Sequence, residues 1–261
     1  MIDLRRIALF TRDQEQDYRL GSLSKLFRRA NIEVVTEGAD APAGSVDLVI
    51  ALGGDGTVIR ALQAHPGTPV LAVNFGTVGF LTQSDREHLD KTLVRLLSDD
   101  YFIEERLTLE VVYRGQTWRC INEVVVKGST SMIEIHCVIN GRRIHSPRGD
   151  GVIVGTPTGT TAYLLSTGAP IVTPEVDCLI LKPLNEYSFS SRSIILSGSA
   201  QIRLTVEEGR ERNIFMSVDG GEPVAITPGE PIDVQRSSVS ARLVCFEPDY
   251  FFRNLKERLR W

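Results

Sequence analysis

The segment most informative about the fold is DLVIALGGDGT at residues 47–57, in which an apolar run ends on a turn with three glycines and one carboxylate. The run at 47–52 is almost continuously apolar, which is typical of a strand covered on both faces. Glycines on both sides of Asp55 remove Cβ atoms, so backbone N–H groups can point at a phosphate chain. Asp55 itself repels phosphate, so its presence calls for a specific role, either binding Mg²⁺ or accepting a proton from an attacking hydroxyl. The alternative is a tight turn with an exposed aspartate.

The residues around this segment alternate between strand-like and helix-like patterns. Short apolar runs predict strands at 7–10, 32–35 and 69–75, and apolar residues at three- and four-residue spacing predict helices at 14–30, 57–65 and 85–97. In the last helix, Leu89, Leu93, Leu96 and Leu97 are expected on one face. This alternation implies an α/β domain with a parallel, Rossmann-like sheet. Ligands of such sheets bind beyond the carboxyl ends of the strands, which is where Asp55 follows its strand.

The pattern changes near residue 101. β-Branched runs predict strands at 108–113, 119–127, 133–139, 194–196, 201–206, 214–218 and 241–246. Asn140-Gly141 and Asp219-Gly220 are turn signals. We therefore expect three parts: an α/β domain at 1–100, an all-β, β-sandwich-like domain at 101–249, and a C-terminal helix at 250–261 that packs back on the first domain.

Composition excludes several classes of protein. The chain has 261 residues, with 29 Lys and Arg against 33 Asp and Glu, for a net charge of −4. A weakly acidic chain is a poor candidate for binding nucleic acid, which calls for a basic surface. The apolar runs are far shorter than the ~20 residues that span a bilayer, so no membrane partner is expected. The four cysteines are scattered without a CxxC pair, which argues against a zinc site or disulfides and favours a cytoplasmic location.

The glycines are not spread evenly along the chain. Ten of the 22 fall in residues 53–57, 74–82 and 147–170. The turn at 53–57 matches neither GxxxxGK[ST] nor GxGxxG, the two common phosphate-binding motifs. The clustering nevertheless points to a site, since glycine is used where backbone approaches another group closely.

Three motifs in these clusters, and a fourth at 122–125, resemble segments of NAD kinases. GGDGT at 53–57 is shared with diacylglycerol and sphingosine kinases and with 6-phosphofructokinases. NFGTVGFLT at 74–82, NEVV at 122–125 and GDGVIVGTPTGTTAY at 149–163 are similar to segments of NAD kinases, in the same order along the chain. This resemblance implies phosphorylation of the 2′-hydroxyl of the adenosine ribose of NAD to give NADP, with ATP and a divalent metal, Mg²⁺ being expected.

The resemblance also implies roles for individual residues. Asp55 would be the catalytic base, Asn122 and Glu123 would hold the adenosine part, and Arg148 and Asp150 would face the nicotinamide half, in some relatives across a subunit boundary. A homodimer or homotetramer is therefore expected. The full set of expected substrate- and cofactor-binding residues is Asp55, Gly56, Arg60, Phe75, Asn122, Glu123, Arg148, Asp150, Thr158, Thr161, Ala162, Tyr163, Leu164, Leu165, Ser166 and Asn185.

Other interpretations remain open at this point. A lipid or sphingoid kinase shares GGDGT but usually has no TPTGTTAY-type segment. A non-catalytic dinucleotide sensor would be expected to lose Asp55, which is present. For Arg60, the simpler alternative is a solvated charge on the surface of a helix. Whether polyphosphate replaces ATP as phosphoryl donor also stays open.

Overall fold

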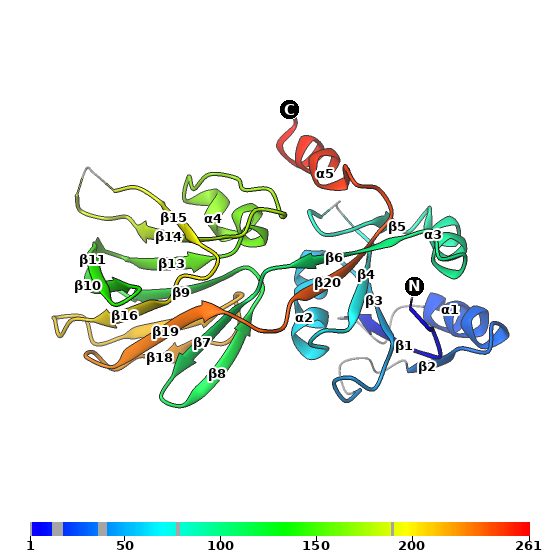
Figure 1. Ribbon diagram of the computed structural model, residues 1–261, viewed down its shortest axis with the longest axis horizontal. Helices are drawn as coiled ribbons and strands as arrows, with labels where there is room; N and C mark the ends of the chain where they lie inside the picture. The colour runs from blue at the N-terminus through cyan, green and yellow to red at the C-terminus, as the bar shows by residue number, and fades with distance from the viewer. Residues whose placement is uncertain (1, 12–17, 36–40, 77–78, 189–190) are drawn as a thin grey trace. The chain divides into compact units, whose positions relative to one another are not determined.

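A computed structural model describes the chain except for residues 1, 12–17, 36–40, 77–78 and 189–190. The chain forms two compact units. The first comprises Met1–Glu105 and Val239–Trp261, and the second comprises Arg106–Ser238 (Figure 1). The first unit is therefore discontinuous in sequence, because its last segment follows the whole of the second unit.

The first unit contains a sheet whose paired strands are mostly parallel. Its strands are β1 (Arg6–Thr11), β2 (Glu33–Val35), β3 (Leu48–Leu52), β4 (Pro69–Asn74), β5 (Ser84–Asp85), β6 (Phe102–Arg106) and β20 (Ala241–Cys245). Their order is β2-β1-β3-β4-β20-β6, with β5 beside β4. β1, β3 and β4 pair in parallel with their neighbours. Every residue of β3 and β4 is buried, so the α/β expectation for this region is confirmed.

Helices cover both faces of this sheet. They are α1 (Tyr18–Arg29), α2 (Asp55–Ala64), α3 (Leu89–Leu97) and α5 (Tyr250–Leu259). α1 and α3 pack against one face, and α2 lies on the other (Figure 1). α3 buries Leu93 and Leu96, whereas Leu97 is 40% exposed. Leu97 lies four residues after Leu93, at the edge of the same apolar face and at the last position of the helix, which is why its side chain is only partly covered. Residues 14–17 of the first expected helix lie outside the described residues.

Strand β20 corrects the expectation that residues 241–246 continue the β-rich part. It pairs in parallel with β4, with Arg242 opposite Pro69 and Leu243 opposite Val70. Four of its five residues are buried, as befits a strand with both faces covered. A short apolar run shows that a strand is buried, but it carries no information about which sheet the strand joins. Helix α5 follows β20, and Asn254 Nδ2 donates to the carbonyls of Phe80 and Thr82 within the same unit.

The second unit consists of two antiparallel sheets. Its strands are β7 (Leu109–Tyr113), β8 (Gln116–Cys120), β9 (Glu123–Gly128), β10 (Ile133–Ile139), β11 (Arg142–His145), β12 (Arg148–Gly149), β13 (Gly151–Gly155), β14 (Cys178–Leu184), β15 (Ile194–Ser197), β16 (Ile202–Val206), β17 (Ile214–Val218), β18 (Val224–Ala225) and β19 (Pro231–Arg236). One sheet has the order β11-β10-β16-β19-β7-β8, with β12 beside β10, and the other has the order β15-β14-β13-β9-β17-β18. The short helices η1 (Thr158–Thr161) and α4 (Tyr163–Ser166) follow β13.

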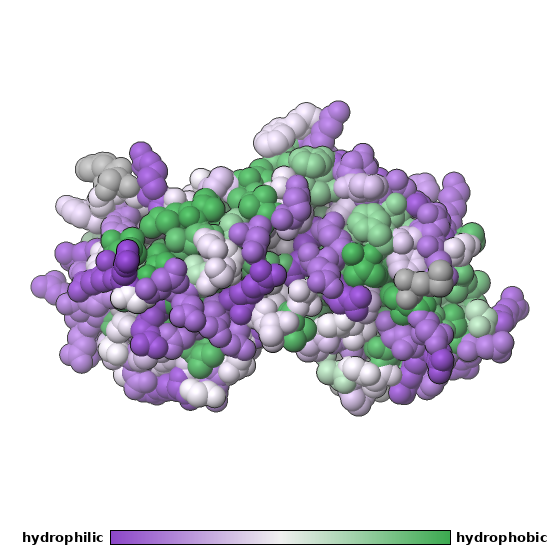
Figure 2. Space-filling view, viewed as in Figure 1, coloured by the Kyte–Doolittle hydropathy of each residue, from purple (hydrophilic) through white to green (hydrophobic). Residues whose placement is uncertain are grey.

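The two sheets enclose one core, as the all-β expectation requires. β10 alternates between buried residues and half-buried ones, and its inward side chains join a cluster with residues from both sheets. Asn140-Gly141 forms the predicted hairpin turn, with φ of 50° and 77°. Hydrophilic residues cover most of the visible surface, with apolar ones gathered over β14 and β15 (Figure 2). No helix among the described residues is long and apolar enough to cross a membrane.

One expected strand is divided in two. The run at 119–127 was expected to form a single strand, but β8 ends at Cys120 in one sheet and β9 begins at Glu123 in the other. Ile121 and Asn122 carry the chain from one sheet to the other. Arg119-Cys120 and the valines of β9 follow one another with no Gly or Pro between them, so the local sequence does not reveal the crossing point.

Candidate active site

The glycine turn lies at the carboxyl end of β3, where α2 begins. Gly53 has a φ of +155°, and a Cβ there would lie 2.5 Å from Thr57 Oγ1, so no side chain fits. Gly54 is the N-cap of α2 and Asp55 is its first residue. The amino end of a helix exposes backbone N–H groups and favours anions. The turn therefore combines an anion-binding helix end with a carboxylate.

Asp55 connects this turn to the second glycine segment. Its Oδ2 accepts the backbone N–H of Phe80 at 2.8 Å, and its Oδ1 accepts that of Leu81 at 3.0 Å. The segment keeps its own shape through Thr82, whose Oγ1 accepts the N–H of Gly79 at 3.1 Å. The carboxylate is half-buried and has a defined orientation. Thr77 and Val78 of the NFGTVGFLT segment lie outside the described residues.

The other expected residues of the first unit differ in exposure. Gly56 and Arg60 are exposed on α2, so both are accessible to a ligand at the amino end of that helix. Phe75 is half-buried and packs against the core cluster of the first unit. Phe75 therefore contributes to packing directly before the second glycine segment.

In the second unit, the turn formed by Thr156-Pro157-Thr158-Gly159, called here the TPTG turn, is hydrogen-bonded to residues 121–122. The Thr156 N–H donates to the Asn122 carbonyl at 2.9 Å, and Thr156 Oγ1 donates to the Ile121 carbonyl at 2.7 Å. A Cβ at Gly159 would lie 2.7 Å from the Asn122 carbonyl carbon. Backbone meets backbone at this point, and only glycine leaves room for it.

Glu123 is the buried titratable group beside this turn. The residue is 6% exposed, and Oε2 has no hydrogen-bond partner among the described residues. Burial and the nearby Asp219 carboxylate raise the pKa of Glu123 to about 8, against a smaller opposing effect of the Tyr163 backbone N–H. Near neutral pH this carboxyl group carries a proton and can donate a hydrogen bond.

The residues of η1 and α4 divide between the core and the surface. Thr158 is buried and its Oγ1 accepts from Arg106 Nη1 at 3.1 Å. Leu164 is fully buried in an apolar cluster with β13 and β14, so its side chain serves packing. The remaining expected residues lie nearer the surface, with Tyr163 39% exposed: Thr161, Ala162, Tyr163, Leu165 and Ser166.

A cavity of about 390 Å³ collects three of the expected residues. Tyr163, Ser166 and Asn185 line it together with Lys182 and Glu186. Asn185 has a φ of +44°, and its Nδ2 donates to Asp150 Oδ2 at 2.7 Å. This hydrogen bond joins two of the expected binding residues, Asn185 and Asp150.

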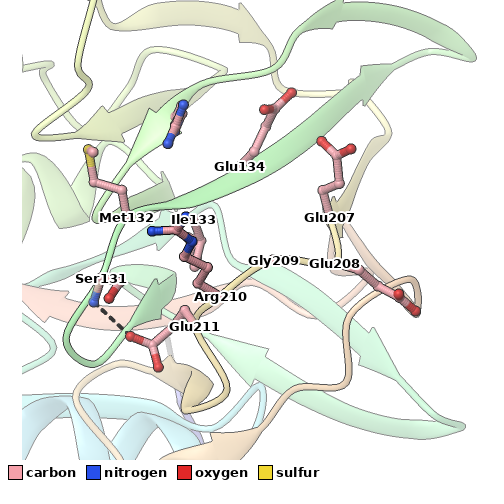
Figure 3. Close-up of a pocket in the computed structure, with 10 residues that line it drawn as sticks. Ser131, Met132, Ile133, Glu134, Glu207, Glu208, Gly209, Arg210 and Glu211 are labelled. Carbon is pink, nitrogen blue, oxygen red and sulfur yellow. Dashed lines mark hydrogen bonds between the residues drawn. The ribbon is translucent and has the colours of Figure 1, made fainter.

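Arg148 lines a different cavity, of about 580 Å³, on the outer face of β10. Figure 3 shows its acidic lining and the N–H of Ser131, which donates to Glu211 at 2.7 Å. Glu211 also accepts from Thr130 and Asn213. The structure therefore brings Tyr163, Ser166 and Asn185 together and places Arg148 against another set of neighbours.

One group among the described residues is close enough to share a metal ion: Glu134, His136 and Glu207, with ligand atoms within 4.8 Å of one another. Glu134 and Glu207 are labelled in Figure 3. The Arg143 guanidinium, which can only donate, lies 2.8 Å from His136 Nδ1. The hydrogen-bond network thus assigns the ring proton to Nε2, which is 3.7 Å from Glu207. A nitrogen that carries a proton does not bind a metal, so this tautomer places the Nε2 proton beside the Glu207 carboxylate instead.

Several residues with clear structural roles were absent from the expected set. Gly79 and Gly159 lie inside the recognised motifs, where the clustering of glycine was the available signal. Asp219 was interpreted only as a turn residue, yet its carboxylate contacts residues 121–123. No local pattern reveals that contact, because it joins segments 97 residues apart.

Comparisons with known proteins agree across both units. Residues 10–101 match the family model described as ATP-NAD kinase N-terminal domain, and residues 121–246 match that of the ATP-NAD kinase C-terminal domain. The chain is similar to the NAD kinase of Symbiobacterium thermophilum, with 39% identity over 230 residues, 84% of this chain and 81% of that protein. It is 32% identical to the NAD kinase of Citrifermentans bemidjiense over 248 residues, 92% of this chain and 86% of that protein.

A solved structure extends the likeness to the fold. The crystal structure of an NAD kinase from Archaeoglobus fulgidus in complex with ATP superimposes with a TM-score of 0.83. The alignment covers 98% of each chain at 26% identity. The likeness therefore includes the α/β unit, the β-rich unit and the returning C-terminal segment.

Proposed function

The chain belongs to the ATP-NAD kinase family, and on that basis we propose how its residues transfer a phosphoryl group from ATP to the 2′-hydroxyl of the adenosine ribose of NAD, giving NADP. An alcohol attacks the γ-phosphoryl group through a loose transition state. Catalysis of such a step consists mainly of positioning and of stabilising charge. The protein must hold a phosphate chain, orient a hydroxyl and accept its proton.

Asp55 is our proposed catalytic base. A carboxylate is too weak to deprotonate a free alcohol, so it takes the proton late, as the new P–O bond forms. The two oxygens offer about four acceptor sites. Two of these are used by the N–H groups of Phe80 and Leu81, which orient the carboxylate and leave acceptor capacity for a hydroxyl.

We assign the phosphate chain to the amino end of α2. The N–H groups around Gly56 and the positive end of the helix dipole favour an anion there. Arg60 is exposed one turn further along the helix and adds a positive charge. Local donors thus allow an acidic protein of net charge −4 to bind a polyanionic ligand.

The second unit supplies the proposed dinucleotide-binding residues. Asn122 and the protonated Glu123 are assigned to the adenosine part, where amide and carboxyl groups can pair with base and ribose edges. The exposed ring of Tyr163 offers a stacking surface. Arg148 and Asp150 are assigned to the nicotinamide half by the resemblance to the family, and Asn185, whose amide donates to Asp150, is assigned with them. Leu164 supports the site only through packing.

We propose that Mg²⁺ arrives with ATP rather than in a site built by the protein. Asp55 is the one carboxylate among the residues assigned to this end of α2, and the acceptor capacity that its two N–H contacts leave is assigned to the ribose hydroxyl. Phosphate oxygens suit Mg²⁺, which keeps several ligands from nucleotide and water. The ion supplies charge neutralisation on the phosphates when bound. Activity should therefore disappear with EDTA while the thermal stability of the unliganded protein stays unchanged.

Two further assignments concern the setting of the enzyme. We propose a homodimer or homotetramer, which sedimentation equilibrium tests directly. We also propose a cytoplasmic location, supported by four cysteines that are all buried free thiols. Polyphosphate is tested as a second donor by replacing ATP in the same assay.

The contact of Asp55 with the Phe80–Leu81 backbone is the observation that carries the catalytic proposal, and Asp55→Asn tests it. Asp47→Asn is the matched control. Asp47 also accepts two backbone N–H groups, from Arg5 and Arg6, but it stands at the amino end of β3. We expect Asp55→Asn to bind NAD and to lose turnover by at least about 10²-fold, the size of a general-base contribution. Asp47→Asn should form NADP at the wild-type rate. Near-normal turnover by Asp55→Asn overturns the assignment.

A further inference from the structure

Three successive backbone amides converge on one carboxylate where β8 passes into β9. Asp219 Oδ2 accepts the N–H of Ile121 at 2.7 Å, and Oδ1 accepts those of Asn122 at 2.7 Å and Glu123 at 3.2 Å. Amides of a regular strand alternate in direction, so three amides on one acceptor form an anion-binding concavity. Here the anion belongs to the chain itself. The Cys120 thiol donates to Oδ1 as well, at 3.3 Å.

Asp219 is held in place from its own backbone. It occupies the turn after β17 with a φ of +49°, and its N–H donates to the Glu123 carbonyl at 3.0 Å. β17 pairs with β9 so that Val218 stands opposite Val124. The carboxylate therefore reaches the start of β9 from the neighbouring strand. Both the main chain and the side chain of Asp219 form hydrogen bonds with the segment at 121–123.

The same short segment supports the TPTG turn through its carbonyl groups. Ile121 and Asn122 accept from Thr156, and Gly159 packs against Asn122. Asp219 thus binds the N–H groups of residues 121–123, while Thr156 of the TPTG turn binds the carbonyl groups of residues 121 and 122. A change at Asp219 is transmitted to the turn through two peptide units.

We propose that Asp219 is a positioning residue of the dinucleotide subsite, whose carboxylate holds residues 121–123 in the one backbone conformation that presents the Asn122 and Glu123 side chains and seats the TPTG turn. This inference rests on the proposed assignment of Asn122 and Glu123 to the adenosine part of NAD. It goes further in naming the group that makes the subsite rigid.

Asp219 also acts on the charge of the subsite. Burial, together with the Asp219 carboxylate, keeps the Glu123 carboxyl protonated near neutral pH. The Cys120 thiol beside it stays neutral, since burial and Asp219 raise its pKa well above the ordinary value. Asp219 is the charged side chain that raises the pKa of Glu123, and the Tyr163 N–H is the dipole that lowers it. Glu123 therefore remains a hydrogen-bond donor and does not oppose the phosphates of NAD.

A simple turn residue would have none of these effects. Asparagine tolerates a positive φ as readily as aspartate and serves equally well in turns. Asp219→Asn therefore keeps the turn, removes the charge, and turns an N–H₂ group toward at least one of the three amides. Asp99→Asn is the matched control, because Asp99 is exposed and has a φ of +56°.

The experiment measures NAD binding by calorimetry, and KM and kcat for NAD and ATP, from pH 6 to 9.5. For Asp219→Asn we expect the Kd and KM for NAD to rise at least about tenfold, the effect of one unpaired buried N–H. The KM for ATP should change less than twofold.

In the wild type, the KM for NAD should rise as the pH passes through about 8, where Glu123 loses its proton. In Asp219→Asn this rise should move to lower pH, because the neighbouring negative charge is gone. Asp99→Asn should match the wild type.

Two results would overturn the inference: an unchanged NAD affinity with an unchanged pH profile, or equal losses for NAD and ATP, which would indicate general destabilisation. Asn122→Ala separates this outcome from a failure of the proposed function. If Asn122→Ala binds NAD normally, the subsite assignment fails. If Asn122→Ala weakens NAD binding and Asp219→Asn does not, the subsite assignment stands and the positioning role of Asp219 is refuted.

A second variant keeps the test decisive should Asp219→Asn not fold. Asp219→Glu keeps the negative charge and moves the carboxylate by one methylene. The KM for NAD should then rise, while the pH at which it rises stays near the wild-type value. An unchanged KM in this variant counts against the positioning role.

Discussion

Gly79 and Asp55 are in direct contact: a Cβ built at Gly79 would lie 2.7 Å from Asp55 Cγ and 3.0 Å from its Oδ2. The glycine is needed for this approach, since the N–H groups of the next two residues hold the same carboxylate. The orientation of the proposed base therefore depends on a residue that has no side chain.

Gly79→Ala should displace the Asp55 carboxylate and lower kcat by about 10²-fold, the effect of a misplacement on the order of 1 Å. The KM for NAD should change little. Gly21→Ala is the control, because nothing lies within 4 Å of a Cβ at Gly21 in α1. It should keep full activity and gain up to about 1 kcal/mol of stability. A wild-type kcat in Gly79→Ala would show that the contact is not needed for catalysis.

Glu123→Gln should change how stability depends on pH. The folded-state pKa of about 8 lies above the ordinary 4.5, so the folded protein holds this proton more tightly than the unfolded chain. The stabilisation is therefore fully present below pH 4.5 and is lost as the pH rises toward 8, by a few kcal/mol at most. The free energy of unfolding measured with urea should be the same for Glu123→Gln and the wild type near pH 4.5. At pH 8.5 it should be higher for Glu123→Gln. Glu175→Gln, at an exposed position, should follow the wild type at both pH values. Parallel curves for Glu123→Gln and wild type would refute the prediction.

Glu211→Gln should destabilise the second unit at neutral pH. The N–H groups of Asn213, Thr130 and Ser131 and the Thr130 hydroxyl hold the pKa of Glu211 at about 2. A lowered pKa means that this stabilisation is present above pH 4.5 and is lost as the pH falls toward 2. The Tm of Glu211→Gln should be several degrees below that of the wild type at pH 7, and the difference should shrink by pH 3. Glu208→Gln, an exposed neighbour in Figure 3, should leave the Tm unchanged. An equal Tm deficit at both pH values would mean that charge plays no part.

Gly159→Ala should weaken NAD binding more than ATP binding. The added Cβ would meet the carbonyl carbon of Asn122 at 2.7 Å and its Cα at 3.0 Å, and backbone cannot rotate aside. We expect a loss of about 1–3 kcal/mol in stability and at least about a tenfold rise in the KM for NAD. Gly209→Ala should change neither, because the nearest atom to its Cβ is 4.0 Å away. An unaltered KM would show that the TPTG turn tolerates displacement.

Local patterns were sufficient for much of the architecture. The continuous apolar runs before Gly53 and at 69–75 predicted buried parallel strands, because a strand covered on both faces needs apolar residues at every position. Asn140-Gly141 predicted its hairpin turn through the positive φ that both residues tolerate. The glycine motifs indicated the family, since their spacing reflects backbone approaches that few sequences share.

Other features depend on contacts between distant segments. β20 joins β4 although its sequence suits either unit, and the run at 119–127 divides between two sheets. Leu164, expected near the ligand, packs in the core. The family, the α/β and β-rich parts and the motif residues could all be inferred from the amino-acid order, because they follow from local periodicity and backbone freedom. That Asp219 meets Asn122 across 97 residues emerged from the folded chain alone, because burial and chain reversal select such partners and no local pattern records them.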